Sequence, residues 1–167
     1  MNIKEIKPST IIDDLRNSFA ISPEMDENNY IITDKDINLD NYHLNIELVS
    51  KLLGYMSFFK FCHWSAKTMD LHKALDDFYK ILSEYVDEMA EVLQGIDEQF
   101  NIEDFNVINL NGEKHTCLDA LNMLKQDIQN FVEDCSTEPQ YIGAVDISTT
   151  FLKDIAQYTY LFRLCKD

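Results

Sequence analysis

The stretch FKFCHWSAKTMDLHKALDDFYKILSEYVDEMAEVLQG runs from residue 59 to residue 95 and contains two histidines and seven acidic residues. Both histidines and three of the acids have types and spacing that could bind a metal. These five candidate ligands are His63, His72, Asp76, Asp87 and Glu91. Imidazole and carboxylate groups together suit iron, zinc or manganese, and a site rich in carboxylates with one or two histidines favours a redox metal over structural zinc. The residue types therefore indicate a metal site capable of redox chemistry.

Helical spacing places most of these side chains on one face of a single helix. With about 100° per residue and His72 set at zero, Asp76 falls at about 40°, Asp87 at about 60° and Glu91 at about 100°. Seven apolar residues of the same segment fall between about -120° and -40°. They are Leu71, Leu75, Phe78, Leu82, Val86, Met89 and Leu93. A ligand stripe thus lies beside a core stripe, and His63 at the end of the preceding helix could converge with it.

The axial spacing of the two aspartates limits what one chain can do. Asp76 and Asp87 are eleven residues apart, which is about 16 Å along a helix, so one metal centre cannot bridge them. Two copies packed antiparallel about a two-fold axis near Ile81 and Leu82 would bring the two ends together, in the isologous arrangement commonest in homo-oligomers. The predicted shared site takes His63, His72 and Asp76 from one chain and Asp87 and Glu91 from its partner.

Several of these residues also have an ordinary interpretation. His72 fits a histidine near a helix start. Exposed helices often carry acids at this density, so Asp87 and Glu91 fit a solvated face as well. His63 fits a hydrogen-bonded histidine at a helix boundary. Trp64 fits hydrophobic packing, or an oxidisable neighbour of the metal that intercepts radicals. Three acids flank the stripe and fit either an outer layer around the metal or surface solvation, namely Asp77, Glu84 and Glu88.

Apolar periodicity predicts the helices that position these residues. A first helix runs from about residue 44 to 64, the connector SAKTMD follows, and a second helix runs from Leu71 to a C-cap at Gly95. Residues 96–115 form a crossing segment with a short helix in its first half. Thr116 and Asp119 begin a third helix with a capping box, and a fourth follows the break STEPQYIGAVD.

The predicted fold class is all-α, a ferritin-like four-helix bundle over residues 41–167 with a long connection between helices 2 and 3. Residues 1–40 are polar and acidic and form an N-terminal arm. One short helix is expected in this arm, capped by Thr10 and Asp13. The link between the first two helices of the bundle is only a few residues long, so these helices form an antiparallel hairpin.

Composition limits the classes of partner. The chain has 30 acidic and 14 basic residues and a net charge of -16, which disfavours binding to nucleic acids or anionic membranes and favours cations. Four cysteines lack any Cys-x-x-Cys pair, and the N-terminus lacks the apolar run of a signal peptide. We therefore expect reduced thiols, a cytoplasmic location and no transmembrane span. A thiol hydrolase is disfavoured because Cys62 and His63, as helix neighbours, point about 100° apart.

The pair HW followed by LHKALDDFYKILSEYVDEMAEVL resembles the mini-ferritins of the Dps type. The resemblance covers about 35 residues of the chain. Carried across, the family's metal ligands fall on His63, His72, Asp76, Asp87 and Glu91. The segment from His63 to His72 is three residues shorter than in that family and lacks its N-x-K-G-P loop, and no Lys-rich N-terminal tail is present. The sequence segment HKALDDFY also resembles small ferritin-like proteins encoded by tailed phages.

The resemblance implies a homo-oligomeric iron protein that oxidises and sequesters Fe²⁺ at a mono-iron or di-iron centre shared between two antiparallel subunits. A two-fold dimer is the minimum assembly, and a hollow shell is implied for storage. Another divalent metal also fits these ligands. The alternative function is a non-catalytic structural or interaction protein with the same bundle, located in a host cytoplasm or a virion if a phage encodes it. In that case the acids provide solubility and partner recognition.

Overall fold

The computed structural model describes residues 39–96, 99–108, 110, 112 and 114–165, with side chains from residue 43 onward. The elements in chain order are α2 (Leu39–Ser65), α3 (Met69–Ile96), the 3₁₀ helix η1 (Ile102–Asp104), α4 (Cys117–Cys135), the 3₁₀ helix η2 (Pro139–Tyr141) and α5 (Ile142–Leu164). The described part of the chain contains no strand. The all-α prediction with four long helices is confirmed, and most of the predicted N-terminal arm, including Thr10 and Asp13, lies outside the described residues.

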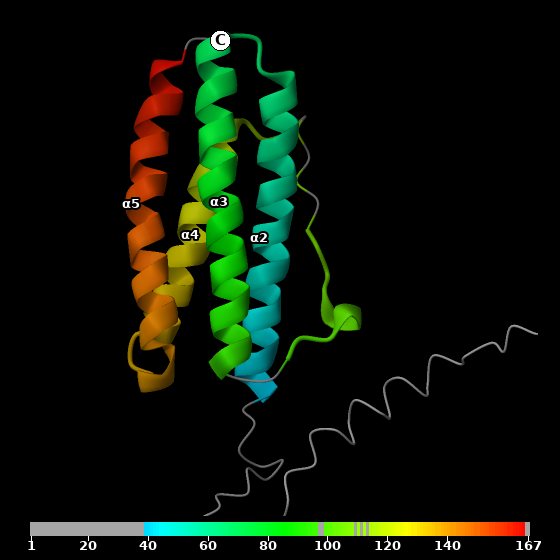
Figure 1. The fold of residues 1–167 in the computed structure, drawn as a ribbon, viewed down its shortest axis with the longest axis vertical. Helices are drawn as coiled ribbons and strands as arrows, with labels where there is room; N and C mark the ends of the chain where they lie inside the picture. The colour runs from blue at the N-terminus through cyan, green and yellow to red at the C-terminus, as the bar shows by residue number, and fades with distance from the viewer. Residues whose placement is uncertain (1–38, 97–98, 109, 111, 113, 166–167) are drawn as a thin grey trace, which may run out of the picture. The chain divides into compact units, whose positions relative to one another are not determined.

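The four long helices pack side by side, as Figure 1 shows. Contacts join α2 with α3, α3 with α5, α5 with α4 and α4 with α2, so each helix has two neighbours around a common core. The short connector between α2 and α3 makes them an antiparallel hairpin. The crossing segment after α3 carries the chain back along α2, and α4 therefore starts at the same end of the bundle as α3 (Figure 1). This end, where α2 and α3 join, is called the hairpin end below.

The core stripe predicted for α3 is largely confirmed. The buried residues of this helix are Leu75, Phe78, Leu82, Tyr85, Val86, Met89 and Leu93. Leu71 of the predicted stripe is only half-buried. Phe78 lies at the centre of an aromatic cluster that joins three helices, with ring centroids 4.8 Å from Phe59 of α2 and 5.1 Å from Tyr158 of α5. Burial of this stripe fixes the rotation of α3 and hence the direction in which its polar residues face.

One predicted helix cap and one predicted helix start are wrong. Gly95 is helical, α3 ends at Ile96, and no glycine among the described residues adopts a positive φ, so Gly95 is not a C-cap. Helix α5 begins at Ile142, inside the stretch expected to be a break. Pro139 sets a 3₁₀ turn that leads directly into α5, and Ala144 packs into the core there. The predicted capping box of α4 is confirmed, because the Thr116 side chain accepts from the backbone of Asp119 and the Asp119 side chain accepts from the backbone of Thr116.

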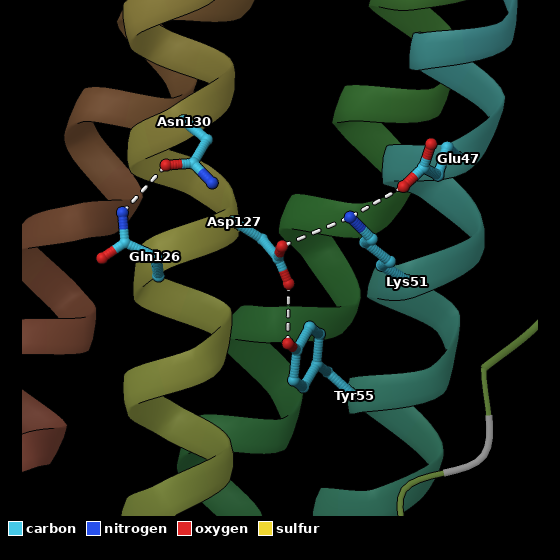
Figure 2. A network of polar contacts seen from close by, with 6 residues as sticks. All are labelled: Glu47, Lys51, Tyr55, Gln126, Asp127 and Asn130. Atoms are coloured by element: carbon cyan, nitrogen blue, oxygen red, sulfur yellow. Dashed lines mark hydrogen bonds and ion pairs between the residues drawn. The ribbon is translucent and has the colours of Figure 1, made fainter.

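A polar network joins α2 to α4 away from the hairpin end (Figure 2). The buried Tyr55 hydroxyl donates to Asp127 at 2.7 Å, and Lys51 lies 3.4 Å from the other carboxylate oxygen and 2.9 Å from Glu47. Burial, and then the hydrogen bond to Asp127, raise the pKa of Tyr55 well above its ordinary value, so the phenol stays protonated and remains a donor. This network fixes the register of α4 against α2.

The crossing segment packs against α2 where that helix carries a glycine. Gly54 is buried, and a Cβ added to it would lie 2.5 Å from the Ile108 side chain and in conflict with the Ile108 carbonyl. Next to it, the backbone N–H of Asn106 donates to the Ser50 hydroxyl at 3.2 Å. None of the described helices is both long and apolar enough to cross a membrane.

Candidate metal site

The short connector brings two histidines together at the hairpin end. His63 lies in the last turn of α2 and His72 in the first turn of α3. Thr68 begins α3, because its hydroxyl accepts from the Leu71 N–H at 3.3 Å and its carbonyl accepts from the His72 N–H at 3.0 Å. The two imidazole rings stack with their centroids 4.1 Å apart and their planes at 29°. His63 is buried and His72 is half-buried.

Reciprocal hydrogen bonds orient the two rings. Nδ1 of His63 lies 3.2 Å from the carbonyl oxygen of His72, and Nδ1 of His72 lies 3.0 Å from the carbonyl oxygen of His63. A carbonyl can only accept, so each Nδ1 carries the hydrogen, and the Nε2 of a neutral ring keeps its lone pair. Metal-binding histidines commonly donate one ring N–H to a carbonyl in this way and bind metal through the other nitrogen. The Nε2 of each neutral ring is therefore the nitrogen left to accept a proton or a metal ion.

Asp76 lies one turn after His72, beside His63. Its Oδ1 is 3.9 Å from Nδ1 of His63, while its Oδ2 is 2.7 Å from the amine of Lys80. The hydrogen bond from Lys80 is the main cause that lowers the pKa of Asp76 below its ordinary value, so the carboxylate is ionised at neutral pH. The structure thus brings three predicted residues to one place, but the carboxylate is held by a lysine.

The other two predicted ligands lie far along the same helix. Asp87 and Glu91 are exposed and form no ion pair with a described residue. Their helical separation from Asp76 is about 16 Å or more, so they do not join it within one chain. Over the described part of the chain, no three His, Cys, Asp or Glu side chains are arranged so as to hold a metal ion. The structure describes one chain, so the predicted completion of the site by a partner subunit stays a prediction.

Trp64 is 65% exposed and is therefore not packed into the core. It meets Phe61, which is 62% exposed, edge to face with the ring centroids 5.6 Å apart. The Lys60 amine lies over the Tyr79 ring at 4.2 Å and at 5.9 Å from the Trp64 ring. The outer side of the α2–α3 hairpin therefore carries apolar and cationic groups next to the histidine pair.

The three flanking acids lie in two different places. Asp77 is exposed and lies 3.6 Å from the Lys80 amine, next to Asp76. Glu84 and Glu88 line a shallow groove of about 290 Å³ between α3 and α5, together with Asp146 and Asp154. This groove is on the side of α3 that faces α5, whereas His63 approaches α3 from α2.

Sequence reasoning did not identify Lys80 as part of the site. The spacing of Asp76 and Lys80 could have predicted this contact, because an acid four residues before a lysine forms an ion pair on a helix surface. It also did not identify the contact between Cys62 and Cys117, for which the sequence gives no signal. A hydrogen bond with Cys117, and then burial, raise the pKa of the Cys62 thiol, so Cys62 is a neutral thiol in the resting protein.

The function of this chain has to be inferred from its own residues. Comparisons with protein families, with curated proteins and with solved structures found no match. The candidate site therefore rests on the local geometry at the hairpin end, where a buried histidine, a half-buried histidine and one ionised carboxylate lie together in an acidic protein.

Proposed function

We propose that this protein binds and oxidises ferrous iron at sites shared between two antiparallel copies, in a ferritin-like bundle of the Dps type. The observation that carries the proposal is the pair His63 and His72. The Nδ1 of each ring donates a hydrogen bond to the backbone carbonyl of the other residue, so the Nε2 of each ring is available to bind a metal. Asp76 adds a carboxylate beside them. Asp87 and Glu91 of a second copy would supply the remaining oxygen ligands.

Iron is the substrate in this proposal, and charge favours its capture. The net charge of -16 raises the local concentration of divalent cations. Carboxylates favour Fe³⁺ over Fe²⁺, so a site with several of them promotes oxidation. With hydrogen peroxide as oxidant, two Fe²⁺ ions give one electron each, the O–O bond breaks, and two protons complete two waters. A closed shell built from such dimers would retain the ferric product.

A second candidate is a non-catalytic interaction protein, and the Lys80 contact favours it. The Lys80 amine already neutralises Asp76 at 2.7 Å. A cation that binds Asp76 has to displace this amine, which lowers the affinity of the site. The exposed rings of Phe61 and Trp64 next to it would suit a contact surface. The two candidates differ in whether the site binds and oxidises iron.

Aerobic titration with Fe²⁺, followed by ferric absorbance, separates the two candidates. The test variant replaces Asp87 and Glu91 with alanine and should lose saturable oxidation. The matched control replaces Glu84 and Glu88 with alanine, which removes the same charge from the same helix on the side facing α5. Equal loss in both variants would show that only net charge matters. Absence of saturable oxidation in the unmodified protein would favour the interaction protein.

A mixing experiment tests whether the site is shared between copies. One variant carries His63→Ala and His72→Ala, and the other carries Asp87→Ala and Glu91→Ala. Each should be inactive alone. After co-refolding in equal amounts, half of the dimers are mixed and each mixed dimer has one intact site out of two, so about a quarter of the activity should return. If no activity returns although light scattering shows dimers, the site is not shared in this way.

Removal of the Lys80 amine, which competes with a cation for Asp76, should strengthen the binding of Fe²⁺. Lys80→Met frees Asp76 and should lower the Fe²⁺ concentration needed for half-saturation several-fold. Lys73→Met is the matched control, because Lys73 is also an exposed lysine of α3 and removes the same charge. If both variants tighten binding equally, Asp76 is not a ligand and the gain is a general effect of charge.

A further inference from the structure

The hairpin end of the bundle also contains most of the protein's thiols. All four cysteines are present as thiols. Three of them line one cavity of about 690 Å³, namely Cys62 near the end of α2, Cys117 at the start of α4 and Cys165 after α5. Each of the three is half-buried. The cavity is large enough to admit a small oxidant.

Two of these thiols are in direct contact. The side chains of Cys62 and Cys117 are joined by a hydrogen bond. They are 55 residues apart in sequence and belong to two helices that pack against each other. Both thiols also line the same cavity at the junction of these two helices, so a disulfide would link neighbouring elements and not distant ones.

The positions of the two thiols suggest different roles. Cys117 is the first residue of α4, directly after the N-cap Thr116, and the unpaired N–H groups and positive end of a helix dipole favour a thiolate there. His115 lies on the wall of the same cavity. Cys62 lies in the last turn of α2, and the negative end of a helix dipole does not favour a thiolate. Cys117 is thus the better nucleophile and Cys62 the thiol beside it.

We propose that Cys62 and Cys117 form a peroxide-oxidised, reversible disulfide that links the end of α2 to the start of α4. The Cys117 thiol loses its proton, the thiolate attacks one oxygen of hydrogen peroxide, the O–O bond breaks, and a sulfenic acid forms while the departing hydroxide takes up a proton and leaves as water. Cys62 then attacks the sulfenyl sulfur, the S–S bond forms, the S–O bond breaks, and a second water leaves. The two thiols lose two electrons in total and the peroxide gains them. A dithiol reductant reverses the reaction by thiol exchange.

This disulfide does not depend on the proposed iron chemistry, so its test is done without metal. Full-length protein treated with chelator is exposed to one equivalent of hydrogen peroxide, the remaining thiols are alkylated, and the peptides are identified by mass spectrometry. We expect loss of two of the four thiols, an intramolecular peptide pair containing Cys62 and Cys117, and full recovery with dithiothreitol. Cys135, which lies outside the cavity, should stay reduced during the peroxide treatment and should then be alkylated.

Three variants separate the roles. Cys62→Ser should stop at a sulfenic acid on Cys117, which dimedone traps. Cys117→Ser should lose both the disulfide and the trapped adduct at equal peroxide. Cys135→Ser is the matched control and should oxidise as the unmodified protein does. The proposal is overturned if Cys135 reacts as fast as Cys117, if the pair found is Cys117 with Cys165, or if the disulfide joins two chains.

Discussion

The contact between Gly54 and the crossing segment gives a prediction whose size can be worked out. In Gly54→Ala the new methyl would lie 2.5 Å from the Ile108 side chain and in conflict with the Ile108 carbonyl. A flexible side chain could move aside at little cost, but the carbonyl belongs to the backbone and cannot. Overpacking of this kind costs about 1–3 kcal/mol. Replacing glycine with alanine inside a helix returns about 0.5–1 kcal/mol, so the net destabilisation should lie between about 0 and 2.5 kcal/mol, with a central value of about 1 kcal/mol.

Gly95→Ala is the matched control for this prediction. Gly95 is also helical, and an added Cβ would meet nothing within 4 Å. This variant should therefore show only the propensity gain, a stabilisation of at most about 0.5–1 kcal/mol because Gly95 lies in the last turn of α3. The difference between the two variants isolates the cost of the contact with Ile108. Urea unfolding followed by circular dichroism measures both free energies of unfolding, provided that the slope is unchanged.

Two outcomes of the Gly54→Ala experiment test whether the crossing segment packs on α2. If Gly54→Ala is as stable as Gly95→Ala, the crossing segment does not pack on α2 at this point and the reasoning is refuted. If the crossing segment separates locally instead, limited proteolysis should cut within residues 99–108 faster than in the unmodified protein. That result would show that the substitution destabilises the packing of the crossing segment locally, while the four helices stay folded.

The remaining predictions concern polar contacts. Tyr55→Phe removes the 2.7 Å hydrogen bond to Asp127 and should cost about 1–2 kcal/mol in unfolding free energy, whereas Tyr160→Phe, at an exposed site, should change it by less than about 0.5 kcal/mol. Thr116→Ala removes the cap of α4 and should cost about 1 kcal/mol. Hydrogen bonds from Thr116 lower the pKa of Asp119, so its contribution is present above the ordinary carboxyl pKa and is lost as the pH falls through the lowered value. Asp119→Asn should therefore flatten the acid side of a stability profile, and an unchanged acid side would contradict this.

The candidate site shows which parts of a structure a sequence can predict. The placement of His63, His72 and Asp76 together followed from helical period and a short connector, because both depend on neighbours within a few residues. The Lys80 contact was also local and could have been predicted from its spacing. The ring orientation of the two histidines could not, since each Nδ1 depends on a carbonyl supplied by the other helix.

The sequence by itself determined the helical class, the core stripe of α3 and the capping box of α4. Each of these depends on contacts three or four residues apart, which the order of residues specifies directly. The tertiary structure decided the early start of α5, the packing of Ile108 on Gly54 and the contact between Cys62 and Cys117. These depend on which surfaces meet after distant segments fold back on one another, and no local pattern encodes that meeting.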